Sequence, residues 1–294
     1  MHICANIVGM EFVMYVLLAL FLGLIQGIAE FLPISSSGHL AIFQNLFNMN
    51  YKEEEHLLFD VLLHLGTLVS IFAVYRAEIK EMLSDGIDYL RIRSDSNSDE
   101  PVTLKPPARA LLFICIGTVP MFIALIFSSA VSRLFFNTMF IGFALIVTGG
   151  LLFVSSKFIK QGNKTEKTMT IADAIFIGLS QAVAILPGLS RSGTTISVGL
   201  ARGLSGTFAV RFSLLLSIPA VLGATIVALY NAIRNGADFS LLPTYLAGFV
   251  VAAGIGFLAI QFLRRVMAKS GLGNFAYYCW GVGALTMILS LIIR

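Results

Sequence analysis

Long apolar runs, each about as long as a bilayer is thick, constrain this chain more than any other feature. Six of them predict transmembrane helices, at residues 59–75, 110–129, 138–155, 208–233, 244–263 and 275–293. Hydrophobic residues make up 57% of the chain and charged residues 12%, which is typical of an integral membrane protein. Long apolar segments with internally satisfied backbones indicate an all-α polytopic protein with a single membrane domain over residues 1–294.

Two further apolar stretches are each broken by the same kind of motif. QGIAEFLPISSSGH and QAVAILPGLSRSGTT both pass through Leu-Pro into a cluster of serine and glycine. One offset, about half the chain, aligns Gln26 with Gln181 and Gly38 with Gly193. The apolar sequence after the first break is too short to cross a bilayer, so we expect two re-entrant helical hairpins, at residues 12–48 and 171–203.

Each predicted hairpin is followed by three spans, which divides the chain into repeats at residues 12–155 and 171–293. Because three is odd, the second repeat would be inserted upside down, which gives an inverted-topology repeat. Lys and Arg gather in the loops of one side, and the positive-inside rule makes that side cytoplasmic. We therefore expect a multi-pass plasma-membrane protein with cytoplasmic basic loops and both termini outside.

Other functional classes find little support in the sequence. The net charge of +4 is explained by these loops, and no basic run is interleaved with aromatic residues as in a nucleic-acid-binding face. Cys4, Cys115 and Cys279 are far apart and lack the spacing of metal ligands. Neither nucleic-acid binding, a zinc site nor a disulfide framework is predicted.

The two breaks predict one shared site. Irregular backbone at membrane depth survives only where protein or a water-filled cavity satisfies its polar groups, and hairpins entering from opposite faces should meet near the middle. Gly38 and Gly193 precede new helical segments, so backbone amides and helix N-termini should point at the tips. Arg191 adds a planar guanidinium that can hold two phosphate oxygens. Gln26 and Glu30, four residues apart, can share a divalent cation, Mg²⁺ or Ca²⁺.

These contents suit a phosphate-bearing ligand. The catalytic candidates are Glu30, Ser36, His39 and Arg191. The substrate-binding candidates supply hydroxyl or backbone-amide donors and are Ser35, Ser37, Gly38, Ser190, Ser192, Gly193, Thr194 and Thr195.

A structural interpretation of the same residues stays open. A serine and glycine cluster after proline is commonly a turn or a helix cap. Glu30 and Arg191 can form a salt bridge that only ties the hairpins together, and His39 can simply donate to a backbone carbonyl. For Asp60 and His64, one turn apart on the first span, packing or support of the site is favoured over catalysis.

Taken together, the two motifs resemble the signature motifs of the undecaprenyl-pyrophosphate phosphatase family, also known for bacitracin resistance. FSLLLSIPA at residues 212–220 is similar to a third, weaker motif, and the likeness covers essentially the whole chain. The resemblance implies a membrane hydrolase that converts undecaprenyl (polyprenyl) diphosphate to the monophosphate, recycling the lipid carrier for peptidoglycan and other cell-envelope glycans. The motif positions carried over from the family fall on Gln26, Glu30, Ser35, Ser36, His39, Ser190, Arg191 and Thr195.

The chain departs from the family pattern at three positions. Many relatives have glutamate in place of Gln26, so cation binding should rest more on Glu30. Cys279 stands where relatives often carry an arginine, so a second phosphate-binding arginine is not expected. Ser37 replaces a frequent threonine and keeps the hydroxyl.

The expected reaction is phosphoryl transfer between the tips, with Arg191 and a cation near Glu30 offsetting the charge of the transferred group. The nucleophile is Ser36, His39 or water, and His39 otherwise acts as base. The rival is a transporter or flippase for a phosphate-bearing lipid or small anion, which shares this architecture. Glu30 beside His39 favours the enzyme, because an anion carrier gains little from a carboxylate. A homodimer, the prenyl length and the open side of the site stay undecided.

Overall fold

The protein is a bundle of helices arranged as a multi-pass membrane protein. The computed structural model describes residues 2–46, 53–94, 103–157, 162–234, 242–269 and 271–292. Within these ranges every regular element is a helix, apart from one isolated bridge between Lys164 and Leu204, which confirms the all-α prediction. The polar composition of residues 76–109 predicts a cytoplasmic loop, but the structure continues in helix to Ser94 and begins a new helix at Pro106; residues 95–102 lie outside the described residues.

Eleven helices are found in the described ranges, and seven of them can cross a membrane by length and composition. In chain order they are α1 (His2–Phe31), α2 (Ser36–Leu46), α3 (Glu53–Ser94), α4 (Pro106–Ile126), α5 (Ser128–Leu134), α6 (Thr138–Ser155), α7 (Ile171–Val183), α8 (Arg191–Ala201), α9 (Gly206–Arg234), α10 (Leu242–Lys269) and α11 (Gly273–Ile292). Six of the seven overlap the predicted spans, although the window in α3 continues to Arg93, well past the predicted end at residue 75. The seventh is the window Val13–Phe31 of α1, where the sequence predicts one arm of a re-entrant hairpin and no span.

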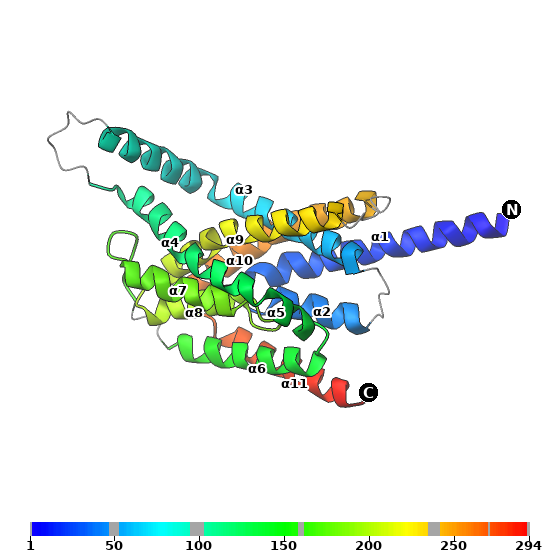
Figure 1. The fold of residues 1–294 in the computed structure, drawn as a ribbon. Helices are drawn as coiled ribbons and strands as arrows, with labels where there is room; N and C mark the ends of the chain where they lie inside the picture. Colours follow the sequence, from blue (N-terminus) through cyan, green and yellow to red (C-terminus); the bar gives the residue numbers. More distant parts are fainter. Residues whose placement is uncertain are drawn as a thin grey trace.

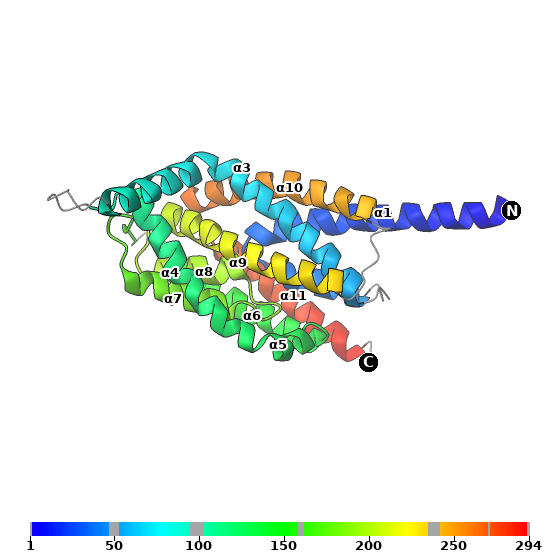
Figure 2. The same cartoon turned by 45° about the horizontal axis from the view of Figure 1, so that its top comes forward.

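Each motif forms a tight tip between two helices. The first tip separates α1 from α2 and the second separates α7 from α8. Pro33 and Pro187 lack the N–H that a helix needs and disfavour helix in the preceding residue, so neither helix continues through its proline. α1 ends at Phe31, two residues before Pro33, and α7 ends at Val183, four residues before Pro187. The reversals use left-handed backbone, with φ of 71° at Ser35 and 93° at Gly188. The first pair of helices enters and leaves at the end where α1 starts and α11 finishes, and the second pair at the opposite end (Figure 1, Figure 2).

Helix packing follows the sequence repeat. α1 of the first repeat packs along α10 of the second, and α7 of the second repeat packs along α4 of the first. Gly23 of α1 abuts the backbone of α10 so closely that a Cβ would lie 2.5 Å from the carbonyl oxygen of Gly248. Gly178 of α7 abuts α4 in the same way, with 2.2 Å to the carbonyl oxygen of Gly117. The offset that aligns the motifs also aligns Gly23 with Gly178, so both halves use one small-residue contact.

A third contact also joins the two repeats. α6 packs along α11, where a Cβ on Gly142 would lie 2.8 Å from the carbonyl oxygen of Gly283. The reciprocal substitution at Gly283 would place a Cβ 2.7 Å from the carbonyl oxygen of Gly142. This reciprocity is what a two-fold relation between α6 and α11 requires.

We expect Gly178→Ala to lower the melting temperature in detergent, because its methyl would force α7 away from α4. Overpacking of this kind costs about 1–3 kcal/mol. The matched control is Gly254→Ala on α10, where an added Cβ meets no atom within 4 Å. That variant should melt at or slightly above the wild-type temperature, because alanine is the better helix former. Equal melting of the two variants would contradict the close contact of α7 with α4.

Candidate active site

The two tips touch each other. A Cβ on Gly38 of the first tip would lie 3.0 Å from Cα of Gly188 in the second. From the second tip, Oγ of Ser192 donates to the carbonyl of Leu32 at 3.3 Å. The predicted meeting of the two breaks is therefore found in the structure, although they are about half the chain apart in sequence.

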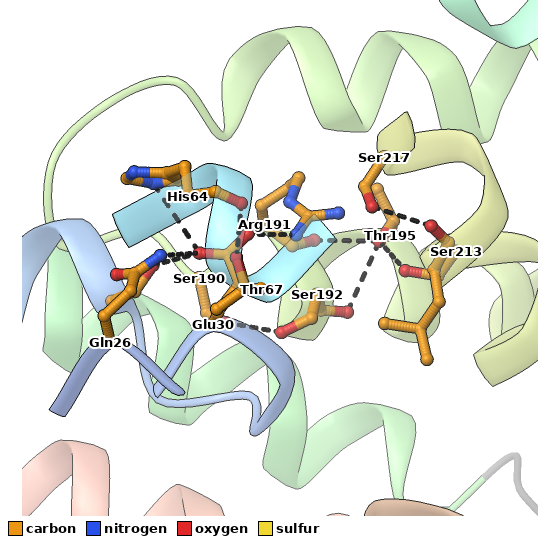
Figure 3. A network of polar contacts seen from close by, with 12 residues as sticks. Gln26, Glu30, His64, Thr67, Ser190, Arg191, Ser192, Thr195, Ser213 and Ser217 are labelled. Carbon is orange, nitrogen blue, oxygen red and sulfur yellow. Dashed lines mark hydrogen bonds and ion pairs between the residues drawn. The ribbon is translucent and has the colours of Figure 1, made fainter. Parts of the chain in front are cut away.

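An ion pair joins the tips at their centre (Figure 3). Nη2 of Arg191 donates to Oε1 of Glu30 at 2.5 Å, and the two side chains are 17% and 6% exposed. Oε2 of Glu30 accepts hydrogen bonds from Nε2 of Gln26 at 3.0 Å and from Oγ of Ser36 at 2.7 Å. Buried charges need this degree of pairing, since desolvation is expensive. Nη1 of Arg191 is nevertheless buried and has no partner within the described part of the chain.

Hydroxyl groups hold the second tip behind Arg191. Oγ of Ser190 caps α8 by accepting from the backbone N–H of Gly193 at 3.0 Å. The backbone N–H of Ser190 donates to Oγ1 of Thr148 at 3.1 Å, which anchors the tip on α6. Oγ1 of Thr195 donates to the carbonyl of Arg191 at 2.8 Å and lies 2.5 Å from Oγ of Ser213 on α9. Each bond fixes the backbone that carries the guanidinium.

His39 lies on the far side of the first tip. Its Nδ1 donates to the carbonyl of Ser35 at 2.8 Å, because a carbonyl can only accept, and its Nε2 therefore accepts from the Tyr278 hydroxyl at 2.8 Å. The imidazole stacks on the Tyr278 ring and is not among the residues that line the cavity. The catalytic role predicted for His39 stays a prediction, and this geometry favours an action through Ser35.

An amphiphilic cavity of about 420 Å³ opens beside the ion pair. Its polar lining consists of Glu30, Ser36, Ser37, Asp60, His64, Gln181, Arg191 and Thr225. The rest of the wall is largely apolar, and part of it is a face of α9 that carries the small side chains Ala220, Ala224 and Ala228. A polar head group and an apolar chain would both find matching surface here.

The predicted site residues divide into two groups. Those that line the cavity are Glu30, Ser36, Ser37 and Arg191. Those that pack behind them, in or next to the tips, are Gln26, Ser35, Gly38, His39, Ser190, Ser192, Gly193, Thr194 and Thr195. Chain proximity to a motif therefore did not decide which hydroxyls face the cavity.

Comparison with known proteins shows which family the chain is similar to. The model of the family described as bacitracin resistance protein BacA matches residues 19–285. The chain belongs to the BacA family. Curated relatives named undecaprenyl-diphosphatase come from Carboxydothermus hydrogenoformans, with 39% identity over 275 residues (92% of this chain, 96% of the relative), and Methanobrevibacter smithii, with 39% over 280 residues (95% and 99%). Undecaprenyl-diphosphatase 1 of Shouchella clausii is 39% identical over 277 residues (94% and 96%). The resemblance based on the two motifs is confirmed.

In this BacA family member, α3 contributes two polar side chains to the cavity wall, whereas the sequence analysis favoured packing or support for them. Asp60 and His64 both line the cavity, and Nε2 of His64 lies 3.7 Å from Oε2 of Glu30. A second repeat within the chain could have shown this. FDVLLH at residues 59–64 recurs as FSLLLS at residues 212–217, which places polar residues one turn apart on α3 and α9.

The residues around Glu30 fit a divalent cation. Oε1 of Gln26 is buried without a partner among the described residues, and the Glu30 carboxylate, with three bonds accepted, has room for one more. Amide and carboxylate oxygens are the ligands that Mg²⁺ and Ca²⁺ prefer. No cluster of three or more His, Cys, Asp or Glu residues suited to a metal occurs in the described ranges, so phosphate oxygens and water would complete the coordination.

We expect strong coupling between Glu30 and Arg191 in a double-mutant cycle of stability. Glu30→Gln and Arg191→Gln should each lower the melting temperature, since each leaves a buried charge unpaired. The double variant should lose less than the sum, with an interaction of about 1–3 kcal/mol. The control cycle uses Lys105 and Asp85, a 2.9 Å pair whose lysine is 66% exposed and screened by water, so its coupling should be small. Additive losses at the buried pair would contradict the contact between the tips.

Proposed function

We propose that this protein hydrolyses undecaprenyl diphosphate to undecaprenyl phosphate and inorganic phosphate, returning the lipid carrier to cell-envelope glycan synthesis. The proposal is carried by one observation. Arg191 lines an amphiphilic cavity, and its buried Nη1 has no hydrogen-bond partner in the described residues. An unsatisfied buried donor is costly, and a phosphate oxygen is the acceptor that a guanidinium fits best. The apolar wall of α9 suits the first prenyl units, and the remaining tail can stay in lipid.

Ser36 is the proposed nucleophile. Its hydroxyl lines the cavity and already donates to Oε2 of Glu30, so the carboxylate can take the proton as Oγ attacks the terminal phosphorus. The bond from this phosphorus to the bridging oxygen breaks, and the electron pair leaves with the prenyl monophosphate, which takes the proton from Glu30. Water then attacks the phosphoserine, and its proton returns to Oγ of Ser36 through Glu30.

The remaining predicted residues support this step. Arg191 offsets the negative charge on the transferred phosphoryl group, and a divalent cation held by Glu30 and Gln26 would add to that effect. His39 acts through Ser35, whose carbonyl it binds, and so keeps the first tip in its left-handed turn. The second tip presents the N-terminus of α8 to the phosphate, with the hydroxyls of Ser190 and Thr195 fixing its backbone.

The proposed topology is an inverted repeat of residues 12–155 and 171–293, with six spans and two re-entrant hairpins. The paired contacts of α1 with α10 and of α7 with α4 support it, as do hairpins that enter from opposite ends. The basic residues at the end of α3, Arg91 and Arg93, lie opposite the end where α1 starts and α11 finishes. Cytoplasmic basic loops would therefore leave both termini outside.

The cavity is proposed to open on the outer side. Its lining reaches Phe135, between α5 and α6, and Ala228, in the last two turns of α9. Both positions lie toward the end where α1 starts and α11 finishes (Figure 1). The transporter alternative is not favoured, because a nucleophile bonded to a carboxylate serves hydrolysis and adds nothing to anion transport.

We expect inorganic phosphate release from a C15 prenyl diphosphate in detergent, lost with EDTA and restored by Mg²⁺ or Ca²⁺. Arg191→Ala should lower kcat/KM by at least about 100-fold, since it removes charge stabilisation of the transferred group. Arg133→Ala, at an exposed arginine on α5, is the matched control and should stay within about twofold, as surface changes usually do. Absence of release from well-folded wild-type protein would refute the phosphatase assignment.

Rapid quench with substrate labelled in the terminal phosphate should trap phosphoserine at Ser36. Ser36→Ala should form no labelled protein and lose nearly all turnover, because the attacking oxygen is gone. Ser37→Ala should still form it, with a raised KM, since Ser37 lines the cavity without bonding to Glu30. A labelled histidine, or turnover without labelled protein, would rule out Ser36 as the nucleophile.

A further inference from the structure

Gln181 is a cavity residue that the proposed reaction leaves without a role. It lies on the buried face of α7, is 1% exposed and contributes to the polar lining. Its Oε1 is buried and has no hydrogen-bond partner among the described residues. A buried amide oxygen without a donor is costly, so its retention in the cavity wall indicates a ligand that donates to it.

A neighbouring carbonyl favours one orientation of this side-chain amide. Nε2 of Gln181 donates to the carbonyl oxygen of Leu216 on α9 at 3.5 Å, a long hydrogen bond. Turning the amide over would place Oε1 against that carbonyl, and two acceptors repel. The acceptor Oε1 therefore remains the atom without a protein partner.

Because Oε1 of Gln181 is an acceptor, it favours a ligand that can donate a hydrogen bond. Phosphate oxygens carry negative charge and are satisfied by the free Nη1 of Arg191, and they would be repelled by Oε1 of Gln181. A water molecule is different, because it can donate one hydrogen to Oε1 and keep a lone pair for attack on phosphorus. Side-chain amides orient attacking water in other phosphoryl-transfer sites.

Gln26 and Gln181 occupy equivalent positions in the sequence repeat but donate to different acceptors. Gln26 aligns with Gln181, and its Nε2 donates to Glu30 at 3.0 Å. The second tip has no carboxylate at the matching position, where Ile185 replaces Glu30. The amide of Gln181 therefore bonds to a backbone carbonyl instead, and both glutamines are left with an unpartnered Oε1 in the described residues.

We propose that Gln181 is a further catalytic residue, which binds and orients the attacking water through Oε1. The inference rests on the proposed hydrolysis. One water hydrogen is held by Gln181, and the other passes to Glu30 as the oxygen bonds to phosphorus. The bond from phosphorus to Oγ of Ser36 breaks, its electron pair stays on Oγ, and Glu30 delivers the proton there. Inorganic phosphate leaves with the remaining hydrogen.

The test separates the two steps by rapid quench with a C15 prenyl diphosphate labelled in its terminal phosphate. Gln181→Leu keeps the size of the side chain and removes the acceptor. We expect release of prenyl monophosphate in the first turnover to stay within about threefold, while steady-state phosphate release falls at least about tenfold and labelled phosphoserine accumulates.

Gln261→Leu makes the same change on α10, outside the cavity lining, and should behave as wild type. A merely structural role for Gln181 would slow both steps together and lower the melting temperature of Gln181→Leu. Unchanged turnover in Gln181→Leu, or an equal slowing of both steps, overturns the inference alone. Absence of any turnover in the wild type overturns the proposed function and the inference with it.

Discussion

The ion pair between Glu30 and Arg191 is the interaction on which the rest of the structure depends. Neither charge is tolerable alone at this depth in an apolar protein, and each is supplied by a different hairpin. Their contact requires two irregular tips to reach the same place from opposite ends of the molecule. The long helices serve this requirement, because they close around both tips and keep lipid away from backbone groups that no helix satisfies.

Close backbone contact is what holds the hairpins in place. Lipid tails are as apolar as leucine, so helices in a membrane gain little from burying large side chains and more from small residues that let backbones approach. Gly23 against α10 and Gly178 against α4 provide one such contact for each hairpin. The repeat thus duplicates the support, while the tips it carries have diverged, one ending in a carboxylate and the other in a guanidinium.

The sequence predicted where the later spans lie, the Leu-Pro breaks and the meeting of the two tips. These follow from hydrophobic length and from the cost of irregular backbone in lipid. The window of α1 was not predicted as a span, because the Leu-Pro break that follows it was interpreted as the tip of a re-entrant hairpin. Motif membership likewise did not separate Ser36, which faces the cavity, from His39, which faces Tyr278.

Side-chain direction and helix crossing explain the other differences. After the left-handed Ser35, small changes of backbone angle decide which serine of the SSSG cluster points at Glu30. The entry of Asp60 and His64 into the cavity depends on how α3 crosses α9, which no local pattern encodes. The repeat of FDVLLH as FSLLLS is weak as sequence. It becomes informative only once α3 and α9 are seen to approach the tips from equivalent positions.

The contact between the tips also explains how a transporter-like architecture can serve a hydrolase. Moving a ligand across the membrane would require the tips to separate, which would break the pair of Glu30 with Arg191 and the backbone contact of Gly38 with Gly188. Hydrolysis needs only one mouth, since the lipid product can leave the way it entered. Closed tips are then an advantage, because they hold the carboxylate, the hydroxyl of Ser36 and the guanidinium in fixed positions and present them to one cavity.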